Sequence, residues 1–146
     1  MTRDLPDEAA TGALAARAAR VARAGDAILL SGPLGAGKSA FARAFLRAAA
    51  GDPDLDVPSP TFTLVQGYDL PRFAAHHFDL WRLTGPADLA ELGWDDAREG
   101  VVLVEWPDRL GPLRPDDALE VTLAPGATPD ARRATLSGWP DRIGAL

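Results

Sequence analysis

The sequence predicts an α/β fold: a three-layer sandwich of helices around a mixed, mainly parallel sheet that ends in a C-terminal β-hairpin. Three observations lead to this expectation. The apolar strand at 27–31 precedes a glycine-rich loop and an alanine-rich helix, which is the order of a parallel strand–helix unit. A second apolar run, Val101–Val104, indicates another buried parallel strand. Two β-like runs at 119–123 and 133–137 flank Pro125–Pro129 and predict the hairpin.

The glycine-rich loop carries the strongest functional signal in the chain. Residues Gly32 to Ser39 read G-P-L-G-A-G-K-S and fit G-x-x-x-x-G-K-[ST], the phosphate-binding P-loop, so the sheet is expected to be P-loop NTPase-like. Glycines let backbone N–H groups surround a phosphate, and the helix that follows adds its positive dipole end. Lys38, the only lysine in the chain, would reach the β- and γ-phosphates, and Ser39 would coordinate Mg²⁺. The nucleotide-binding candidates here are Gly35, Ala36, Gly37, Lys38, Ser39 and Ala40.

Composition narrows the class of protein. The 146 residues, of which 47% are hydrophobic, predict a single domain over residues 1–146 with a sizeable core. No apolar run could form a transmembrane helix, and the first residues lack a signal peptide's apolar stretch, so we expect a cytoplasmic protein without a membrane partner. The chain has no cysteine, which excludes disulfides and thiolate metal sites. Its net charge of −6 indicates that any nucleic acid would be held by a partner.

The first half of the chain predicts two helices and a threonine-bearing loop. One helix begins after Asp7 as N-cap and ends at Gly25, and the second covers Ala40–Ala50. A proline-stiffened segment then leads into a strand expected at Thr61–Gln66. Its two threonines, Thr61 and Thr63, either sense the γ-phosphate and Mg²⁺ or only form the entry to the strand.

The next strand is expected within Ala74–Leu83 and carries an acidic candidate. Asp79 could lie near Mg²⁺ or the attacking water, and a local capping role is the alternative. His76 and His77 are adjacent, so they should face opposite sides of the strand and cannot form a two-histidine metal site. Neither histidine has an obvious partner, which favours structural roles for both.

A second acidic candidate follows the apolar run at 101–104. Glu105 emerges at the carboxyl end of this strand, where parallel strands meet bound phosphates, and is expected to hold Mg²⁺ directly or through water. Trp106 could cover the site or contact a partner. At the return of the C-terminal hairpin, Arg132 and Arg133 are either exposed or one of them approaches the nucleotide, with Arg133 as the candidate.

Together, these motifs resemble the TsaE (YjeE) family of bacterial tRNA threonylcarbamoyladenosine biosynthesis ATPases. The matching stretches are L-P-D-E at 5–8 with Thr11, G-A-G-K-S at 35–39, S-P-T-F-T-L-V at 59–65, H-F-D-L-W-R-L at 77–83 and V-E-W-P at 104–107. The chain departs from the family pattern at Pro33, where Asp is usual, at Ser39 and Ala40, where threonines are usual, and at Trp81, where Tyr is commoner.

The resemblance implies Mg²⁺-dependent ATP hydrolysis in support of a TsaB–TsaD protein complex, which attaches threonylcarbamoyl to adenosine 37 of tRNA. Contact with tRNA would then be indirect, through these partners. Lys38 would bind phosphate, Ser39 and Glu105 would hold Mg²⁺, and Asp79 would serve hydrolysis or metal coordination. Thr61 and Thr63 would belong to the nucleotide-responsive loop, and Thr11 would lie near the base.

The residues leave one other enzyme class open. In a small-molecule or nucleotide kinase, Asp79 would be the base for an acceptor hydroxyl. Arg72, Arg82 or Arg98 would then clamp phosphates. A kinase would consume ATP in strict proportion to a phosphorylated acceptor, whereas the partner-dependent ATPase would not.

Overall fold

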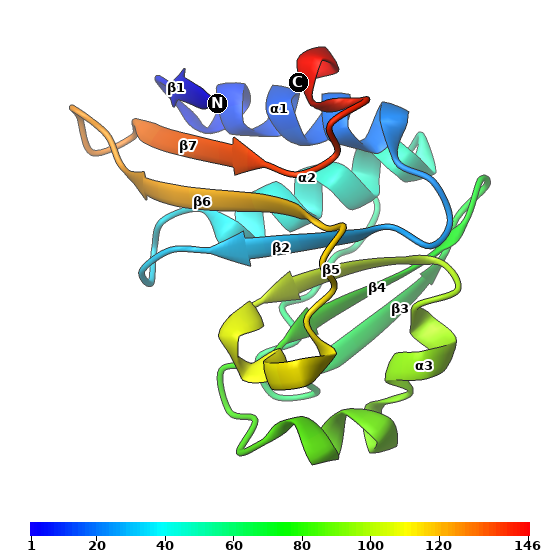
Figure 1. The fold of residues 1–146 in the computed structure, drawn as a ribbon. Coiled ribbons are helices and arrows are strands. Elements are labelled where there is room, and N and C mark those ends of the chain that lie inside the picture. Colours follow the sequence, from blue (N-terminus) through cyan, green and yellow to red (C-terminus); the bar gives the residue numbers. More distant parts are fainter.

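The computed structural model describes residues 1–146 and contains one seven-stranded sheet in the order β1-β7-β6-β2-β5-β4-β3 (Figure 1). The strands are β1 Thr2–Leu5, β2 Ala27–Ser31, β3 Val65–Asp69, β4 Ala74–Asp79, β5 Val101–Glu105, β6 Leu119–Pro125 and β7 Arg132–Ser137. The four central strands, β6, β2, β5 and β4, run parallel. The flanking pairs β1–β7, β6–β7 and β3–β4 are antiparallel, so the predicted mixed sheet and its C-terminal hairpin are confirmed.

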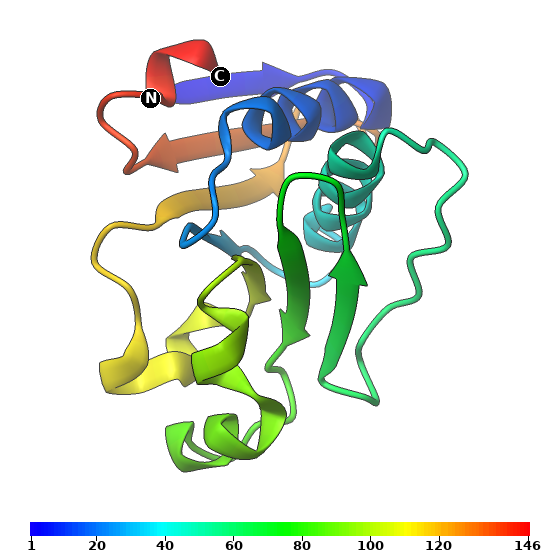
Figure 2. The ribbon, with the colours of Figure 1, turned by 90° about the vertical axis from the view of Figure 1, so that its right-hand side faces the viewer.

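Helical elements cover both faces of this sheet. The helices α1 Glu8–Val21 and α2 Lys38–Ala50 pack against each other on one face, as Figure 2 shows. The short elements η1 Pro86–Leu92, α3 Trp94–Ala97 and η2 Pro107–Leu113 lie on the other, and η3 Ile143–Ala145 ends the chain. No helix has the length and apolar character that crossing a membrane would require.

Strand β2 shows why the apolar runs are unbroken. Ile28 and Leu30 enter the core beneath α1 and α2, whereas Ala27 and Leu29 enter the core beneath the short helices. All four side chains are at most 1% exposed. A parallel strand that is buried on both faces needs apolar residues at every position, so the periodicity of two disappears.

The first predicted helix is shorter in the structure than the sequence suggested. Asp7 is its N-cap as expected, and the Asp7 carboxylate accepts a hydrogen bond from Ala10 N at 2.9 Å. The helix ends at Val21, with Ala22 in extended conformation, so the expectation that Gly25 closes it is wrong. Gly25 has a φ of 95° and instead forms the turn into β2, where its N–H donates to the Gly100 carbonyl.

Strand β1 was not predicted at all. Thr2 to Leu5 is a short, largely polar edge strand whose ladder is formed entirely with β7, more than a hundred residues away. Its own side chains carry little apolar pattern, so local sequence gives no strand signal. The free edge of the C-terminal hairpin supplies the pairing.

The segment expected as a strand at Thr61–Gln66 is mostly a turn. Leu64 N donates to the Pro60 carbonyl at 2.7 Å, and Leu64 adopts a φ of 68°, so β3 begins only at Val65. The Leu64 carbonyl accepts from Asp79 N at 2.9 Å, which fastens the turn to the end of β4. This contact, which is distant in sequence, overrides the β-propensity of the two threonines.

Candidate functional site

The loop between β2 and α2 has the backbone that phosphate binding requires. Gly37 is the N-cap of α2 with a φ of 105°, and no side chain caps the first N–H groups of this helix. Gly32 has a φ of 142°, and a Cβ on it would collide with the Leu123 carbonyl of β6. The loop therefore needs glycine at both positions, and it presents uncapped amides where a helix dipole favours an anion.

Lys38 is the first residue of α2, directly after this loop, and only 6% of its surface is exposed. Its Nζ donates to the carbonyls of Gly32 and Pro33 and lies 4.0 Å from the centre of the Trp106 ring. Burial lowers the pKa of Lys38 from its ordinary value, and the negative charges of Glu105 and Asp79 partly oppose this shift. The lysine is thus a desolvated cation, which attracts phosphate more strongly than one in bulk water.

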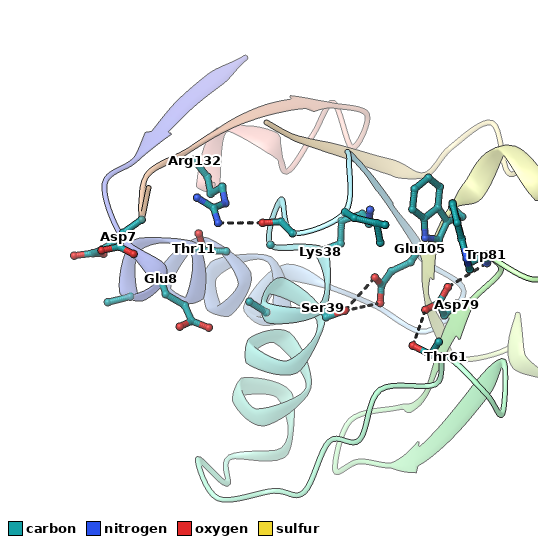
Figure 3. Close-up of a pocket in the computed structure, with 17 residues that line it drawn as sticks. Asp7, Glu8, Thr11, Lys38, Ser39, Thr61, Asp79, Trp81, Glu105 and Arg132 are labelled. Atoms are coloured by element: carbon teal, nitrogen blue, oxygen red, sulfur yellow. Dashed lines mark hydrogen bonds between the residues drawn. The ribbon is translucent and has the colours of Figure 1, made fainter. Parts of the chain in front are cut away.

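Glu105 and Ser39 meet at the carboxyl end of β5, opposite the first turn of α2. Ser39 Oγ lies 3.2 Å from Glu105 Oε1 and 3.4 Å from Oε2, as the dashed lines in Figure 3 mark. Glu105 is 3% exposed, although it carries a carboxylate, and its other partner is the buried His77. A hydroxyl and a carboxylate oxygen beside a phosphate-binding loop are donors suited to Mg²⁺.

Asp79 occupies the same edge one strand away, because β4 and β5 pair in parallel with Asp79 opposite Glu105. Its Oδ1 accepts from Trp81 N at 3.1 Å, and its Oδ2 accepts from Thr61 Oγ1 at 3.4 Å. Thr61 in turn lies 2.7 Å from Ser59 Oγ. The carboxylate therefore connects the end of β4 to the threonine-bearing turn.

The side chains of Lys38, Ser39, Asp79 and Glu105 line one cavity of about 820 Å³, which is within the range of nucleotide and drug-sized sites. Figure 3 shows Ser39, Thr61, Asp79 and Glu105 together at one end. The other end is bounded by the start of α1 and by the C-terminal hairpin. The residues that line this second end are Asp7, Glu8, Ala9, Thr11, Asp130 and Arg132.

Comparison with known proteins identifies the family. The family model described as threonylcarbamoyl adenosine biosynthesis protein TsaE matches residues 5–134. The chain belongs to the TsaE family. It is 37% identical to TsaE of Rickettsia felis over 120 residues, 82% of this chain and 70% of that one. It is 32% identical to TsaE of Bacillus subtilis over 143 residues, 97% of this chain and 86% of that one.

A solved relative supports the same fold. The crystal structure of Bacillus subtilis YdiB superposes with a TM-score of 0.77 at 25% sequence identity, covering 99% of this chain and 88% of that one. The P-loop NTPase-like fold expected from the sequence is thereby confirmed.

Most of the residues singled out from the TsaE-like motifs converge on the cavity. Gly35, Gly37, Lys38, Ser39 and Ala40 line it from the loop, and Thr11, Thr61, Asp79 and Glu105 line it from four other elements. Ala36 is buried beneath the loop, at 2% exposure, and contributes its carbonyl to a hydrogen bond.

Two predicted site residues of this TsaE-family chain lie elsewhere. Arg133 is not among the residues that line the cavity, and its Nε donates to Asp4 at 3.0 Å, whereas its neighbour Arg132 does line the cavity. Arg132 donates to the Ala36 carbonyl at 3.1 Å and to the Gly35 carbonyl at 3.0 Å, which ties the hairpin to the loop. Thr63 does not line the cavity, and its Oγ1 accepts from Gln66 at 3.1 Å.

The sequence reasoning also missed two neighbours of the site. His77 was given no partner, yet its Nε2 lies 2.6 Å from Glu105 Oε2. The available signal was spacing, since His77 and Asp79 are two apart on one strand and must share a face. Trp81 packs against Trp106 with the two rings tilted by 49° and their centres 4.4 Å apart, a contact for which the sequence gives no signal.

The donor set fits a magnesium ion better than a metal that requires a complete protein cage. The structure contains no group of three or more histidine, aspartate or glutamate side chains arranged to hold an ion. Magnesium commonly retains water and takes only one or two protein carboxylates together with substrate phosphates. Ser39 and Glu105 are the residues of this TsaE-family chain that fit such a role.

Proposed function

We propose that this chain is a Mg²⁺-dependent ATPase that supports a TsaB–TsaD complex in the biosynthesis of threonylcarbamoyladenosine in tRNA. The observation that carries the proposal is the convergence of Lys38, Ser39, Glu105 and Asp79 in one cavity. These residues come from the P-loop and from the ends of two parallel strands, which is the arrangement that phosphoryl chemistry requires. The family membership supplies the pathway.

In this proposal, the loop binds the phosphates and Arg132 keeps the loop in shape. Uncapped N–H groups at the start of α2 and the Lys38 ammonium would receive the phosphate charge. Arg132 donates to the carbonyls of Gly35 and Ala36 and so fastens the loop to the C-terminal hairpin, while the Ala36 amide between them donates to the Pro33 carbonyl. The end of the cavity near Thr11 would accept the nucleoside.

Glu105 and Ser39 would hold the magnesium ion. When bound, the ion neutralises charge on the phosphates and helps to orient the γ-phosphate for in-line attack. The chain's own contribution is to keep a buried carboxylate and a hydroxyl within 3.4 Å of each other. Burial strengthens their attraction for a cation because little water competes.

Asp79 would orient the attacking water and transmit the state of the nucleotide to the threonine-bearing turn. Both of its oxygens already accept hydrogen bonds, one from Trp81 N and one from Thr61. This arrangement favours Glu105 as the metal ligand, since Glu105 is the carboxylate that contacts Ser39. Movement of Thr61 would displace Phe62, which is 80% exposed on the same turn.

Two of the three arginines that a kinase would use to clamp phosphates, Arg72 and Arg98, lie away from the P-loop. Arg72 donates to carbonyls at the end of α1, and Arg98 donates to the Gly25 carbonyl. Both arginines therefore lie near the amino end of β2, opposite the P-loop that follows its carboxyl end. The third, Arg82, lies over the Phe62 ring at 4.7 Å.

The decisive experiment measures phosphate release from Mg·ATP by the purified protein, alone and with TsaB–TsaD. We expect slow release alone and a change when the partners are added. Lys38→Ala should abolish release, because it removes the charge in the loop. Release that ignores the partners but is matched by a phosphorylated small molecule would overturn the proposal in favour of a kinase.

A further inference from the structure

His77 is the most deeply buried polar side chain beside the proposed site to which no role has been given. It is 1% exposed, and its Nε2 lies 2.6 Å from Glu105 Oε2. The other ring nitrogen, Nδ1, is buried and has no hydrogen-bond partner. A buried imidazole that satisfies only one of its nitrogens is not explained by packing alone, because an unpaired buried polar atom carries a cost.

The contact has a defined direction. An ionised carboxylate can only accept hydrogen bonds, so His77 Nε2 donates to Glu105 Oε2. With a proton on Nε2, the Nδ1 atom of this tautomer is an acceptor, and Nδ1 has no hydrogen-bond partner in the structure. The hydrogen bond therefore specifies one tautomer of His77.

This hydrogen bond also gives the two Glu105 oxygens different contacts. Oε2 accepts from His77 at 2.6 Å and lies 3.4 Å from Ser39 Oγ, whereas Oε1 has no contact with His77 and lies 3.2 Å from Ser39 Oγ. His77 is a hydrogen-bond partner of Glu105, and the Lys38 ammonium interacts with the same carboxylate electrostatically. Without His77, rotation of the Glu105 carboxylate toward Lys38 would remove the oxygen that faces Ser39.

We propose that His77 is a positioning residue that locks the Glu105 carboxylate through Oε2, so that Oε1 and Ser39 Oγ form a preorganised site for a divalent cation. This inference rests on the proposed function, because it assumes that Glu105 binds the ion. Hydrogen bonds to the distal atoms of a ligating group commonly raise metal affinity, and their loss costs about 10- to 100-fold.

The strand geometry explains why this residue serves the purpose. In β4, His77 and Asp79 share a face, and the parallel register sets His77 opposite Leu103, two residues before Glu105. The long Glu105 side chain can reach back along its strand to the imidazole. His76 faces the other side of β4, with its ring against Gly67, and thus serves as a control at the next position.

The test compares His77→Asn with His77→Gln. The glutamine amide can reach the position of Nε2 and donate to Glu105, whereas the shorter asparagine amide cannot, although both are neutral and polar. Affinity for Mn²⁺ would be measured by electron paramagnetic resonance in the presence of the non-hydrolysable analogue AMP-PNP. Affinity for AMP-PNP in EDTA would be measured in parallel, and His76→Asn is the matched control.

We expect His77→Asn to lose about tenfold or more in Mn²⁺ affinity, with His77→Gln and His76→Asn close to the unsubstituted chain. AMP-PNP affinity in EDTA should be the same in all four proteins. Equal Mn²⁺ affinities in the two His77 variants, whether high or low, would overturn the inference while leaving the proposed function intact. If the unsubstituted chain shows no Mn²⁺ binding with AMP-PNP, the proposed function itself fails.

A second measurement needs no substitution at His77, in case the asparagine variant does not fold. Nitrogen-15 NMR of the two imidazoles, assigned with His76→Asn, reports which nitrogen of His77 is protonated. We expect a proton on Nε2 that is protected from exchange and remains so when Mg²⁺ and AMP-PNP are added. A proton on Nδ1, or rapid exchange of the Nε2 proton on addition of Mg²⁺ and AMP-PNP, would contradict the inference.

Discussion

Lys38 and Trp106 form a direct contact, with the lysine ammonium 4.0 Å from the centre of the indole ring. Trp106 follows Glu105 and adopts a φ of 60°, a left-handed conformation that costs a non-glycine residue about 1–3 kcal/mol. The residue before a proline is further restricted, and Pro107 follows here. The left-handed backbone of Trp106 thus accompanies a contact between its ring and the lysine of the P-loop motif.

Nucleotide binding should therefore be visible in tryptophan fluorescence. Phosphate would compete with the carbonyls of Gly32 and Pro33 for Lys38, so the charge above the Trp106 ring would move. We expect the emission to change on titration with ATP and the change to be largely lost in Trp106→Phe. Trp139→Phe removes an indole from the core beneath α1 and should keep the signal, whereas a signal that survives Trp106→Phe would disprove this origin.

The pH dependence of nucleotide affinity should follow Lys38. Burial lowers the pKa of this lysine from 10.5, and in the proposed function the ammonium binds phosphate. Affinity should thus be constant near neutral pH and fall as pH rises through the lowered pKa, by up to about tenfold per pH unit. Isothermal titration across this range tests it. Lys38→Arg stays charged, so its weaker binding should show no such alkaline decline.

Substitutions of Glu105 and Asp79 should affect the Mg²⁺ dependence of ATP hydrolysis differently. Glu105→Gln removes the carboxylate beside Ser39 and should raise the Mg²⁺ concentration needed for half-maximal ATP hydrolysis by about tenfold or more. Asp79→Asn should instead lower the maximal rate while leaving that Mg²⁺ concentration near its normal value. Steady-state hydrolysis over a Mg²⁺ series distinguishes the roles. A larger shift in the Mg²⁺ requirement for Asp79→Asn would exchange the two assignments.

Arg132 and Arg133 are adjacent, but only Arg132 contacts the loop, so alanine variants of the two form a matched pair. Arg132→Ala removes two hydrogen bonds to the carbonyls of Gly35 and Ala36, so ATP affinity should drop by about 5- to 30-fold. Arg133→Ala removes only an exposed ion pair with Asp4 and should change ATP affinity little. Calorimetric titration of both variants checks this, and equal effects would mean that Arg132 acts by general charge alone.

Replacing the loop glycines Gly32 and Gly35 with alanine should lower the free energy of unfolding by different amounts. Gly32→Ala places a Cβ against the Leu123 carbonyl at a φ of 142°, so the free energy of unfolding should fall by about 2 kcal/mol or more. Gly35→Ala also has a positive φ, 78°, but no atom lies within 4 Å of its Cβ, and the cost should be about 1 kcal/mol. Urea unfolding measures both. A larger loss for Gly35→Ala would contradict the steric argument.

Local patterns sufficed for the elements whose residues carry their own signal. The apolar run of β2, the glycines of the loop and the first turn of α2 follow one another in the chain, so their geometry is set over short range. The same holds for the N-cap at Asp7 and for the closing hairpin. For this reason, the sequence foresaw Lys38, Ser39 and Glu105 at one edge of a parallel sheet.

Contacts between residues distant in the chain decided the features that the sequence did not predict. Strand β1 exists because the edge of β7 is free to pair with it, and the turn at 61–64 exists because the end of β4 fastens Leu64. Which of two adjacent arginines meets the loop depends on the register of the hairpin, since neighbouring side chains on a strand face opposite ways.

By itself, the sequence determined that a loop with the P-loop pattern lies between a buried strand and a helix, because that pattern depends on residue types at fixed spacing. Only the tertiary structure decided the partners of Glu105. His77 and Ser39 are 28 and 66 residues from it in the chain. They meet because β4 pairs with β5 in one register and α2 begins above the same edge.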